Sequence, residues 1–245
     1  MTRRSKSSRI DRRSSRRLTS SQTHKSTSLS RSILLLGATG LVGSHCLRLL
    51  TGDPAFSRVV VLARRALPRE LARANVESHV VDFDRLAAHA ELFRVDQILC
   101  ALGTTIKVAG SQERFRVVDY DYPLAAARIG LEQGATHYLL VSALGADPRS
   151  RVFYSRVKGE LEAAVLALPY RAVTIARPSL LLGPRAEFRL GEQIAKRFAF
   201  LVPGKYKPVG AHAVAATLVR AAREDAPGRR IIESNEIRER AAAAS

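Results

Sequence analysis

Short apolar runs of strand length recur along this chain and alternate with longer segments of helical pattern. Most of the runs show no polar alternation, which is typical of parallel strands that are covered on both faces. The predicted strands are residues 33–36, 59–63, 79–83 including the strand exit, 97–101, 138–141, 172–176 and 230–233. The predicted helices are 41 to about 50, 86–93, 122–132, 154 to about 168, 193–200 and 211–223, with a frayed helical tail at 236–244.

This repeated order of strand, loop and helix predicts the α/β class, with a doubly wound parallel sheet in one domain over residues 32–245. A loop-rich section interrupts the order at about 178–208. No stretch approaches the 18 or more apolar residues of a membrane span.

The first 31 residues are different in kind, because they hold ten basic residues and a single acid, Asp11, and carry half of the net charge of +18. Such a segment cannot bury enough apolar surface to offset its chain entropy, so we expect a disordered basic tail. A twin-arginine export signal is disfavoured because residues 18–30 supply no apolar core. An organelle transit peptide, a nucleic-acid-binding arm and a wrongly assigned start remain open.

Two cysteines, Cys46 and Cys100, are too few for a disulfide framework. Without an export signal they indicate a reducing compartment, and we expect a cytoplasmic location. Neither His137 nor His212 has a partner at the spacing of metal ligands, so we expect no metal site.

A glycine-rich turn follows the first predicted strand and opens the first helix. Gly37, Gly40 and Gly43 are spaced G-x-x-G-x-x-G. One such glycine makes the tight turn, one lets the backbone approach a pyrophosphate, and one lets the helix pack closely on the strand. The N–H groups at the helix start then bind phosphate. We therefore expect this turn, with Thr39, Leu41 and Val42, to bind a dinucleotide.

Arg64 and Arg65 follow the second strand, about twenty residues beyond the glycines. An acid at this place suits the ribose of NAD, whereas arginine suits the 2′-phosphate of NADP, so the sequence favours NADP(H). An arginine pair is otherwise ordinary surface charge. Asp82 and Phe83 stand where such folds contact adenine, although a simple strand exit is as good an explanation. The loop of Ala101, Leu102, Gly103 and Thr104, and Pro178 after the sixth strand, are expected beside the cofactor.

Tyr154 and Lys158 share one face of a predicted helix, and Ser142 ends the strand before it. Carbonyl reduction needs an acid that protonates the developing alkoxide, and a nearby cation would help a tyrosine to do this. Ser142 would orient the substrate oxygen by a hydrogen bond. Alternatively, Tyr154 is only an aromatic residue at a helix start and Lys158 a solvated charge.

With these residues in place, the chain resembles the atypical short-chain dehydrogenases/reductases, and more narrowly the Tat-interacting-protein-like oxidoreductases. Besides the glycine turn and the Ser142, Tyr154 and Lys158 triplet, the likeness lies in residues 100–105, 118–122, 154–160 and 177–183, and it covers about 32–225. It implies a Rossmann fold and NADPH binding. Many members carry an asparagine that supports a proton-relaying water, where this chain has Asp119. This departure puts turnover in doubt, but not cofactor binding.

The resemblance also implies that the section at 178–208 covers the substrate cleft as a lid. Its six arginines and lysines either favour an anionic substrate or form a solvated basic surface. The main hypothesis is an NADPH-dependent oxidoreductase that reduces a small carbonyl compound or oxidises an alcohol. The alternatives are a non-catalytic NADPH-binding sensor or assembly protein and, less favoured, a nucleic-acid binder acting through the tail. Substrate and oligomeric state are not encoded in these motifs.

Overall fold

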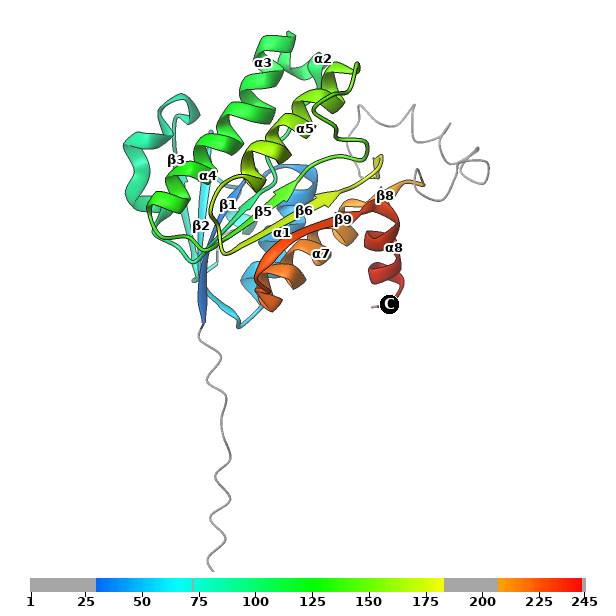
Figure 1. Cartoon of the computed structure of the whole chain (residues 1–245). Helices are drawn as coiled ribbons and strands as arrows, with labels where there is room; N and C mark the ends of the chain where they lie inside the picture. The colour runs from blue at the N-terminus through cyan, green and yellow to red at the C-terminus, as the bar shows by residue number, and fades with distance from the viewer. Residues whose placement is uncertain (1–29, 72, 183–206, 244–245) are drawn as a thin grey trace, which may run out of the picture.

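A parallel sheet forms the centre of the protein in a computed structural model, which describes residues 30–71, 73–182 and 207–243. These residues form a seven-stranded sheet in the order β3-β2-β1-β4-β5-β6-β9 (Figure 1). Its strands are β1 (Arg31–Leu36), β2 (Phe56–Ala63), β3 (Val76–Val80), β4 (Gln97–Cys100), β5 (His137–Val141), β6 (Ala172–Arg177) and β9 (Gly228–Glu233). Every pairing is parallel. The predicted doubly wound α/β fold is thereby confirmed, and the strand order reverses between β1 and β4.

Helices cover both faces of the sheet. On one face lie α1 (Leu41–Gly52) and α7 (Ala211–Glu224), which pack on each other and share a core with alternate residues of β1 and β2 (Figure 1). On the other face lie α4 (Tyr122–Glu132), α5 (Phe153–Leu166) and the 3₁₀ segment η2 (Phe83–Phe93). Because side chains alternate between these two cores, continuous apolar strands are required rather than alternating ones. No helix in the described ranges is both long enough and apolar enough to cross a bilayer.

The structure corrects several predicted bounds. β3 begins at Val76 and ends at Val80, so Val81 and Asp82 form its exit and Phe83 begins η2. The predicted helix at 86–93 is 3₁₀ in type and kinked at Arg85 and His89, which suits a segment of mixed polarity. Arg31 belongs to β1 rather than to the tail, since its N–H donates to the Ala55 carbonyl at 2.8 Å.

The sequence patterns did not predict six short elements. These are η1 (Arg69–Leu71), α2 (Ile106–Ala109), α3 (Gln112–Arg116), η3 (Val117–Asp121), and a small parallel pair made by β7 (Leu181–Leu182) and β8 (Val209–Gly210). The frayed tail is a helix, α8 (Ser234–Ala242). The basic tail up to residue 29, the helix expected at 193–200 and most of the expected lid lie outside the described residues.

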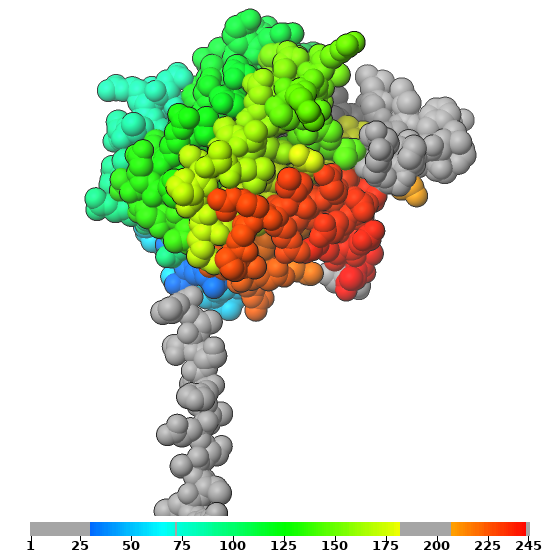
Figure 2. Space-filling model, in the orientation of Figure 1, coloured from blue at the N-terminus to red at the C-terminus, as the bar shows by residue number. Residues whose placement is uncertain are grey.

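The C-terminal strand β9 (Gly228–Glu233) and helix α8 lie at the β6 side of the sheet. β9 pairs with β6, and α8 packs against β9, α7 and β6. In the space-filling view this orange and red region adjoins the green and yellow surface of α5 and β6 (Figure 2). β9 is therefore the edge strand of the sheet next to β6, and α8 follows β9 directly in the chain.

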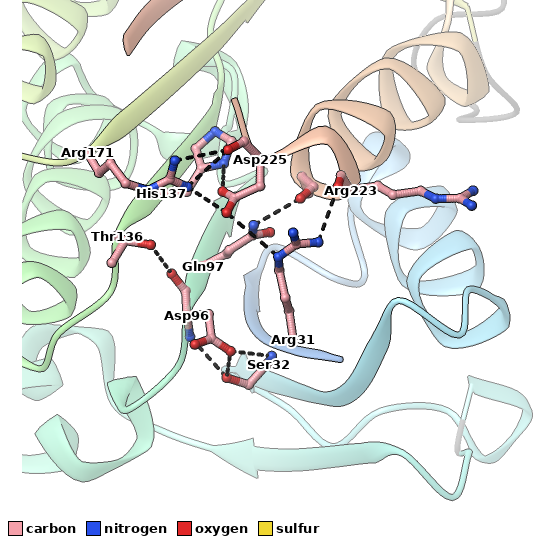
Figure 3. A network of polar contacts seen from close by, with 10 residues as sticks. Arg31, Ser32, Asp96, Gln97, Thr136, His137, Arg171, Arg223 and Asp225 are labelled. Atoms are coloured by element: carbon pink, nitrogen blue, oxygen red, sulfur yellow. Dashed lines mark hydrogen bonds and ion pairs between the residues drawn. The ribbon is translucent and has the colours of Figure 1, made fainter. Parts of the chain in front are cut away.

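A polar network links the elements at the N-terminal edge of the sheet (Figure 3). Nδ1 of the buried His137 lies 3.0 Å from Asp225, and its Nε2 lies 3.0 Å from the Thr174 hydroxyl. Because a carboxylate only accepts, Nδ1 carries the ring hydrogen and Nε2 accepts from Thr174. Asp225, at a left-handed φ of 48°, also pairs with Arg171 at 2.5 Å. The network joins β5 and β6 to the end of α7.

Candidate functional site

A cavity of about 1070 Å³ lies at the C-terminal edge of the sheet. The loops that follow β1, β2, β4, β5 and β6 line it, together with α2 and α5. Ligands in open α/β sheets bind at this edge, where the strand order reverses. The cavity is slightly larger than the usual range of about 300–1,000 Å³ for small-molecule sites.

The glycine turn forms one wall of the cavity and leaves no room for side chains. Gly37 has a left-handed φ of 82°, and a Cβ there would lie 2.5 Å from the Ala101 carbonyl oxygen. A Cβ on Gly43 would lie 2.0 Å from the Gly37 carbonyl oxygen, so this glycine allows α1 to pack on the turn. Any larger residue at Gly37 or Gly43 would therefore push its Cβ against backbone atoms.

The N-terminus of α1 opens toward this cavity. Its N-cap is Gly40, which offers no side-chain hydrogen bond, and its first turn holds no acid. Helices leave their first N–H groups without internal partners, and an anion is a suitable partner for them. Leu41 and Val42 line the cavity at this point. The turn and the helix start therefore fit a diphosphate group.

Tyr154 and Lys158 enter the cavity from the first turns of α5. The Lys158 side chain is 5% exposed, so it is no solvated surface charge, and its Nζ lies 2.7 Å from Oδ1 of Asp119. Asp119 comes from η3 (Val117–Asp121), a π-helical turn between α3 and α4. Its Oδ2 accepts a hydrogen bond from the Thr104 N–H at 2.9 Å. Such π turns often occur at functional sites.

Burial and neighbouring charge set the protonation of this group. Burial alone lowers the pKa of the Lys158 amine, but the attraction of Asp119 and then Tyr154 outweighs it, so the pKa is raised. Burial raises the pKa of the Tyr154 phenol; Lys158 opposes this rise, and Asp119 adds to it. At neutral pH Tyr154 therefore holds its proton, while Lys158 remains a cation.

Ser142 also lines the cavity, but its hydroxyl is already engaged. Its Oγ donates to Oε1 of Glu162, a residue of α5 that is 3% exposed. Arg177 holds the same carboxylate through Nε at 3.0 Å and Nη2 at 2.5 Å, and it reaches Glu233 at 2.9 Å. Since the hydroxyl hydrogen is donated to Glu162, Ser142 in this arrangement can accept a hydrogen bond from a ligand but not donate one.

Most of the site residues expected from the sequence meet in this one cavity. Those that line it are Gly37, Thr39, Gly40, Leu41, Val42, Arg64, Arg65, Phe83, Ala101, Leu102, Gly103, Thr104, Ser142, Tyr154, Lys158 and Pro178. Two do not. Gly43 lies behind the turn, and Asp82 lines an adjoining cavity of about 410 Å³ with Arg64 and Phe83. The Asp82 side chain accepts from the Asp84 N–H at 3.0 Å and so caps η2.

Sequence reasoning missed several residues of the site. Glu162 stands four residues after Lys158, and this spacing on one helix face was a usable signal. Arg177 was noted only as part of a motif. Val108 and Arg114 line the cavity from short helices that the sequence patterns did not predict.

Comparison with known proteins places this geometry in a family. The model of the NAD dependent epimerase/dehydratase family matches residues 33–205. Among curated proteins, the chain is 38% identical to Protein HTATIP2 of Rattus norvegicus over 193 residues, which is 78% of this chain and 79% of that protein. It is 36% identical to "Protein fmp52, mitochondrial" of Emericella nidulans over 172 residues, 68% of this chain and 74% of that protein.

The solved structures agree on the fold. MoeE5 in complex with UDP-glucose and NAD superposes with a TM-score of 0.66 at 16% identity, covering 87% of this chain and 82% of that chain. A UDP-glucose 4-epimerase from Thermotoga maritima gives a TM-score of 0.62 at 16% identity, over 82% and 76% of the two chains.

The relatives overturn one expectation. Fungal relatives from Emericella nidulans, Candida albicans and Eremothecium gossypii are named mitochondrial, which contradicts the cytoplasmic location expected from the cysteine content. Two free, buried cysteines exclude a disulfide framework, but they do not distinguish one reducing compartment from another. The matches otherwise agree with the geometry, and a nicotinamide dinucleotide is the type of cofactor that they support. The chain belongs to the NAD dependent epimerase/dehydratase family.

Proposed function

We propose that this protein is an NADP(H)-dependent oxidoreductase that reduces a carbonyl group with Tyr154 as the proton donor. The observation that carries the proposal is the meeting of Tyr154, Lys158 and the glycine turn in one cavity. The glycine turn alone does not imply this reaction, and neither do Tyr154 and Lys158 without the turn.

The cofactor fits the residues present. Gly37 allows the tight, left-handed turn against Ala101 that positions the start of α1, and this uncapped helix start suits the diphosphate. When bound, a reduced nicotinamide supplies the hydride that the carbonyl carbon receives. The choice of NADP(H) rests on Arg64 and Arg65, which line the end of the cavity next to β2.

Tyr154 then completes the reaction. Its O–H bond breaks, and the proton passes to the carbonyl oxygen as the carbon accepts the hydride, so an alcohol and a phenolate result. A raised pKa keeps the proton on Tyr154 until that moment. Lys158, held as a cation by Asp119, stabilises the phenolate that remains.

A second function, non-catalytic binding of NADPH as a sensor, draws support from the same geometry. Asp119 is paired directly with Lys158, which weakens the pull of that cation on Tyr154. Ser142 directs its hydrogen to Glu162 rather than to a ligand. Both features favour cofactor binding over fast chemistry.

Replacing Tyr154 by Phe separates the two functions. We expect NADPH oxidation with a panel of aldehydes and ketones to fall about a hundredfold or more, because the general acid is lost. Binding of NADPH, followed by its own fluorescence since the chain holds no tryptophan, should persist. Tyr120→Phe is the matched control, because Tyr120 packs against Arg116 outside the cavity. Turnover that is absent in the wild type, with intact NADPH binding, would favour the sensor.

The cofactor choice has its own test. Arg64→Ala and Arg65→Ala should weaken NADPH binding while leaving NADH binding nearly unchanged, because only NADPH carries the 2′-phosphate. Arg85→Ala serves as a control on the neighbouring surface, since Arg85 lines neither cavity. An unaltered ratio of NADPH to NADH affinity would remove the basis for NADP(H).

A further inference from the structure

The two ends of the cavity differ in chemistry. The strand order places the loops after β2 and β3 at one end and the loops after β5 and β6 at the other, with the glycine turn of β1 between them. The β2 end holds Arg64, Arg65 and Arg114, of which Arg64 and Arg114 also line the adjoining cavity. The β6 end, together with α2, holds mainly small and apolar residues: Val108, Ala109, Ala143, Leu144, Gly145, Leu180 and Leu181.

Apolar side chains at the β6 end are also unusually exposed. Six large apolar side chains of the described residues are exposed, and two of them, Val108 at 60% and Leu180 at 42%, line this cavity. A third, Ile106, belongs to the same short helix as Val108. Apolar surface left open beside a few polar groups is typical of a site that binds an apolar molecule.

The polar side chains at this end already have partners. Ser142 donates to Glu162, Lys158 pairs with Asp119, and Ser179 donates to the Lys207 carbonyl at 2.5 Å. The Thr105 hydroxyl caps α2 by accepting from the Val108 N–H at 3.2 Å. Among the described residues of this end, the Tyr154 hydroxyl is the exception, because it makes no hydrogen bond to any of them.

From these observations we propose that the substrate is an apolar carbonyl compound, such as an unbranched ketone or aldehyde, recognised at its one oxygen by Tyr154. This inference rests on the proposed function and names its substrate class. A molecule with several hydroxyls or phosphates would lose hydration at apolar walls without regaining hydrogen bonds. Lys158, the one cation among the described residues of this end, is neutralised by Asp119. The site therefore differs from one that binds a UDP-sugar.

Binding to the protein loaded with NADP⁺ tests the inference without turnover, because oxidised cofactor cannot reduce a ketone. We expect calorimetry to show that affinity rises from 2-butanone through 2-hexanone to 2-octanone. The rise should approach about fourfold per methylene group, which corresponds to about 0.8 kcal/mol for each one buried. Dihydroxyacetone should bind more weakly than acetone. Equal affinities along the series, or stronger binding of dihydroxyacetone, would overturn the proposal.

Two variants locate the contact. Val108→Asp and Leu180→Asp should each reduce 2-octanone affinity about fivefold or more and flatten the chain-length dependence, because a charge replaces apolar wall. NADP⁺ affinity should be unchanged in both. Val152→Asp is the matched control: this valine is 61% exposed and lies outside the cavity, at the N-cap of α5, where aspartate is well tolerated. Equal losses in the control and the cavity variants would contradict the assigned contact.

The outcomes for substrate class and for function are separable. Ketone binding that depends on chain length, without turnover that depends on Tyr154, would support the apolar substrate site and contradict the reductase function. Tyr154-dependent turnover with catalytic efficiency independent of chain length keeps the reductase and overturns the apolar substrate.

Discussion

Charged side chains have close partners at both edges of the sheet, and the two edges use them differently. At the N-terminal edge, Asp225 pairs with His137 and Arg171, and none of these residues lines either of the cavities described above (Figure 3). At the C-terminal edge, Lys158 and Asp119 are equally paired, but both line the large cavity. The contacts at the N-terminal edge therefore join strands, with Arg171 40% exposed, whereas a buried ion pair holds a cation beside a ligand site at the C-terminal edge. The two edges differ in the burial of the charged groups and in the open volume next to them.

Breaking the pair at the C-terminal edge should have the largest effect on stability. Asp119→Ala leaves the Lys158 ammonium buried without a partner, which costs about 3–5 kcal/mol in the free energy of unfolding. Urea denaturation of the full chain measures this loss. The double variant Asp119→Leu with Lys158→Met removes both charges and should recover most of the stability. Equal stability of the single and double variants would mean that Lys158 is not held in a dry environment.

Removing the charge at the N-terminal edge should cost less. Asp225→Asn keeps a residue that tolerates the left-handed φ of 48°, but it replaces a charged acceptor shared by His137 and Arg171. We expect a loss of about 1–3 kcal/mol, with binding of NADPH unaffected. A change in cofactor affinity would show that the two edges are coupled and would break the comparison.

Acidification should act on the N-terminal edge through His137. Burial lowers the pKa of this imidazole below 6.5, and Asp225 only partly opposes the shift. The unfolded chain therefore binds more protons, so stability is complete above about pH 6.5 and is lost as the pH falls toward the folded pKa. One such group changes stability by at most about 1.4 kcal/mol per pH unit. His137→Gln should flatten the dependence of unfolding free energy on pH between 7 and 5.

Breaking an exposed ion pair should give the smallest loss of stability. Arg58 and Glu77 bridge β2 and β3 at 2.8 Å, with side chains that are 35% and 47% exposed. Water screens such a pair, so Glu77→Gln should cost less than about 1 kcal/mol, and high salt should remove even that. A loss as large as that of Asp225→Asn would show that burial does not control these energies.

The sequence predicts best what depends on neighbours along the chain. Continuous apolar runs gave the strands, since a strand covered on both faces has to be apolar throughout. Glycine spacing located the turn, because the close approaches at Gly37 and Gly43 tolerate no side chain. Hydrophobic periodicity does not predict elements as short as α2, because its four residues complete barely one helical turn.

Pairings between distant residues were hidden for a different reason. The bond between Ser142 and Glu162, and the bridge from Arg177 to Glu233, join residues that are 20 and 56 positions apart. Periodicity within one segment carries no information on which partner a buried charge will meet across the sheet. Asp119 was recognised as a departure from a family pattern, yet its direct pairing with Lys158 depends on how η3 and α5 pack together.

The π turn at Val117–Asp121 has a consequence for the helices on either side of it. Successive residues of an α-helix turn by about 100°, and a π turn holds one extra residue, so α4 is out of angular phase with α3 by about that amount. Phe115 of α3 contacts the rings of Phe153 and Tyr154 of α5, while Leu124 and Ala127 of α4 lie in the core beneath that face of the sheet. The one extra residue thus rotates α4 relative to α3, and Val118 and Asp119 within the turn line the cavity.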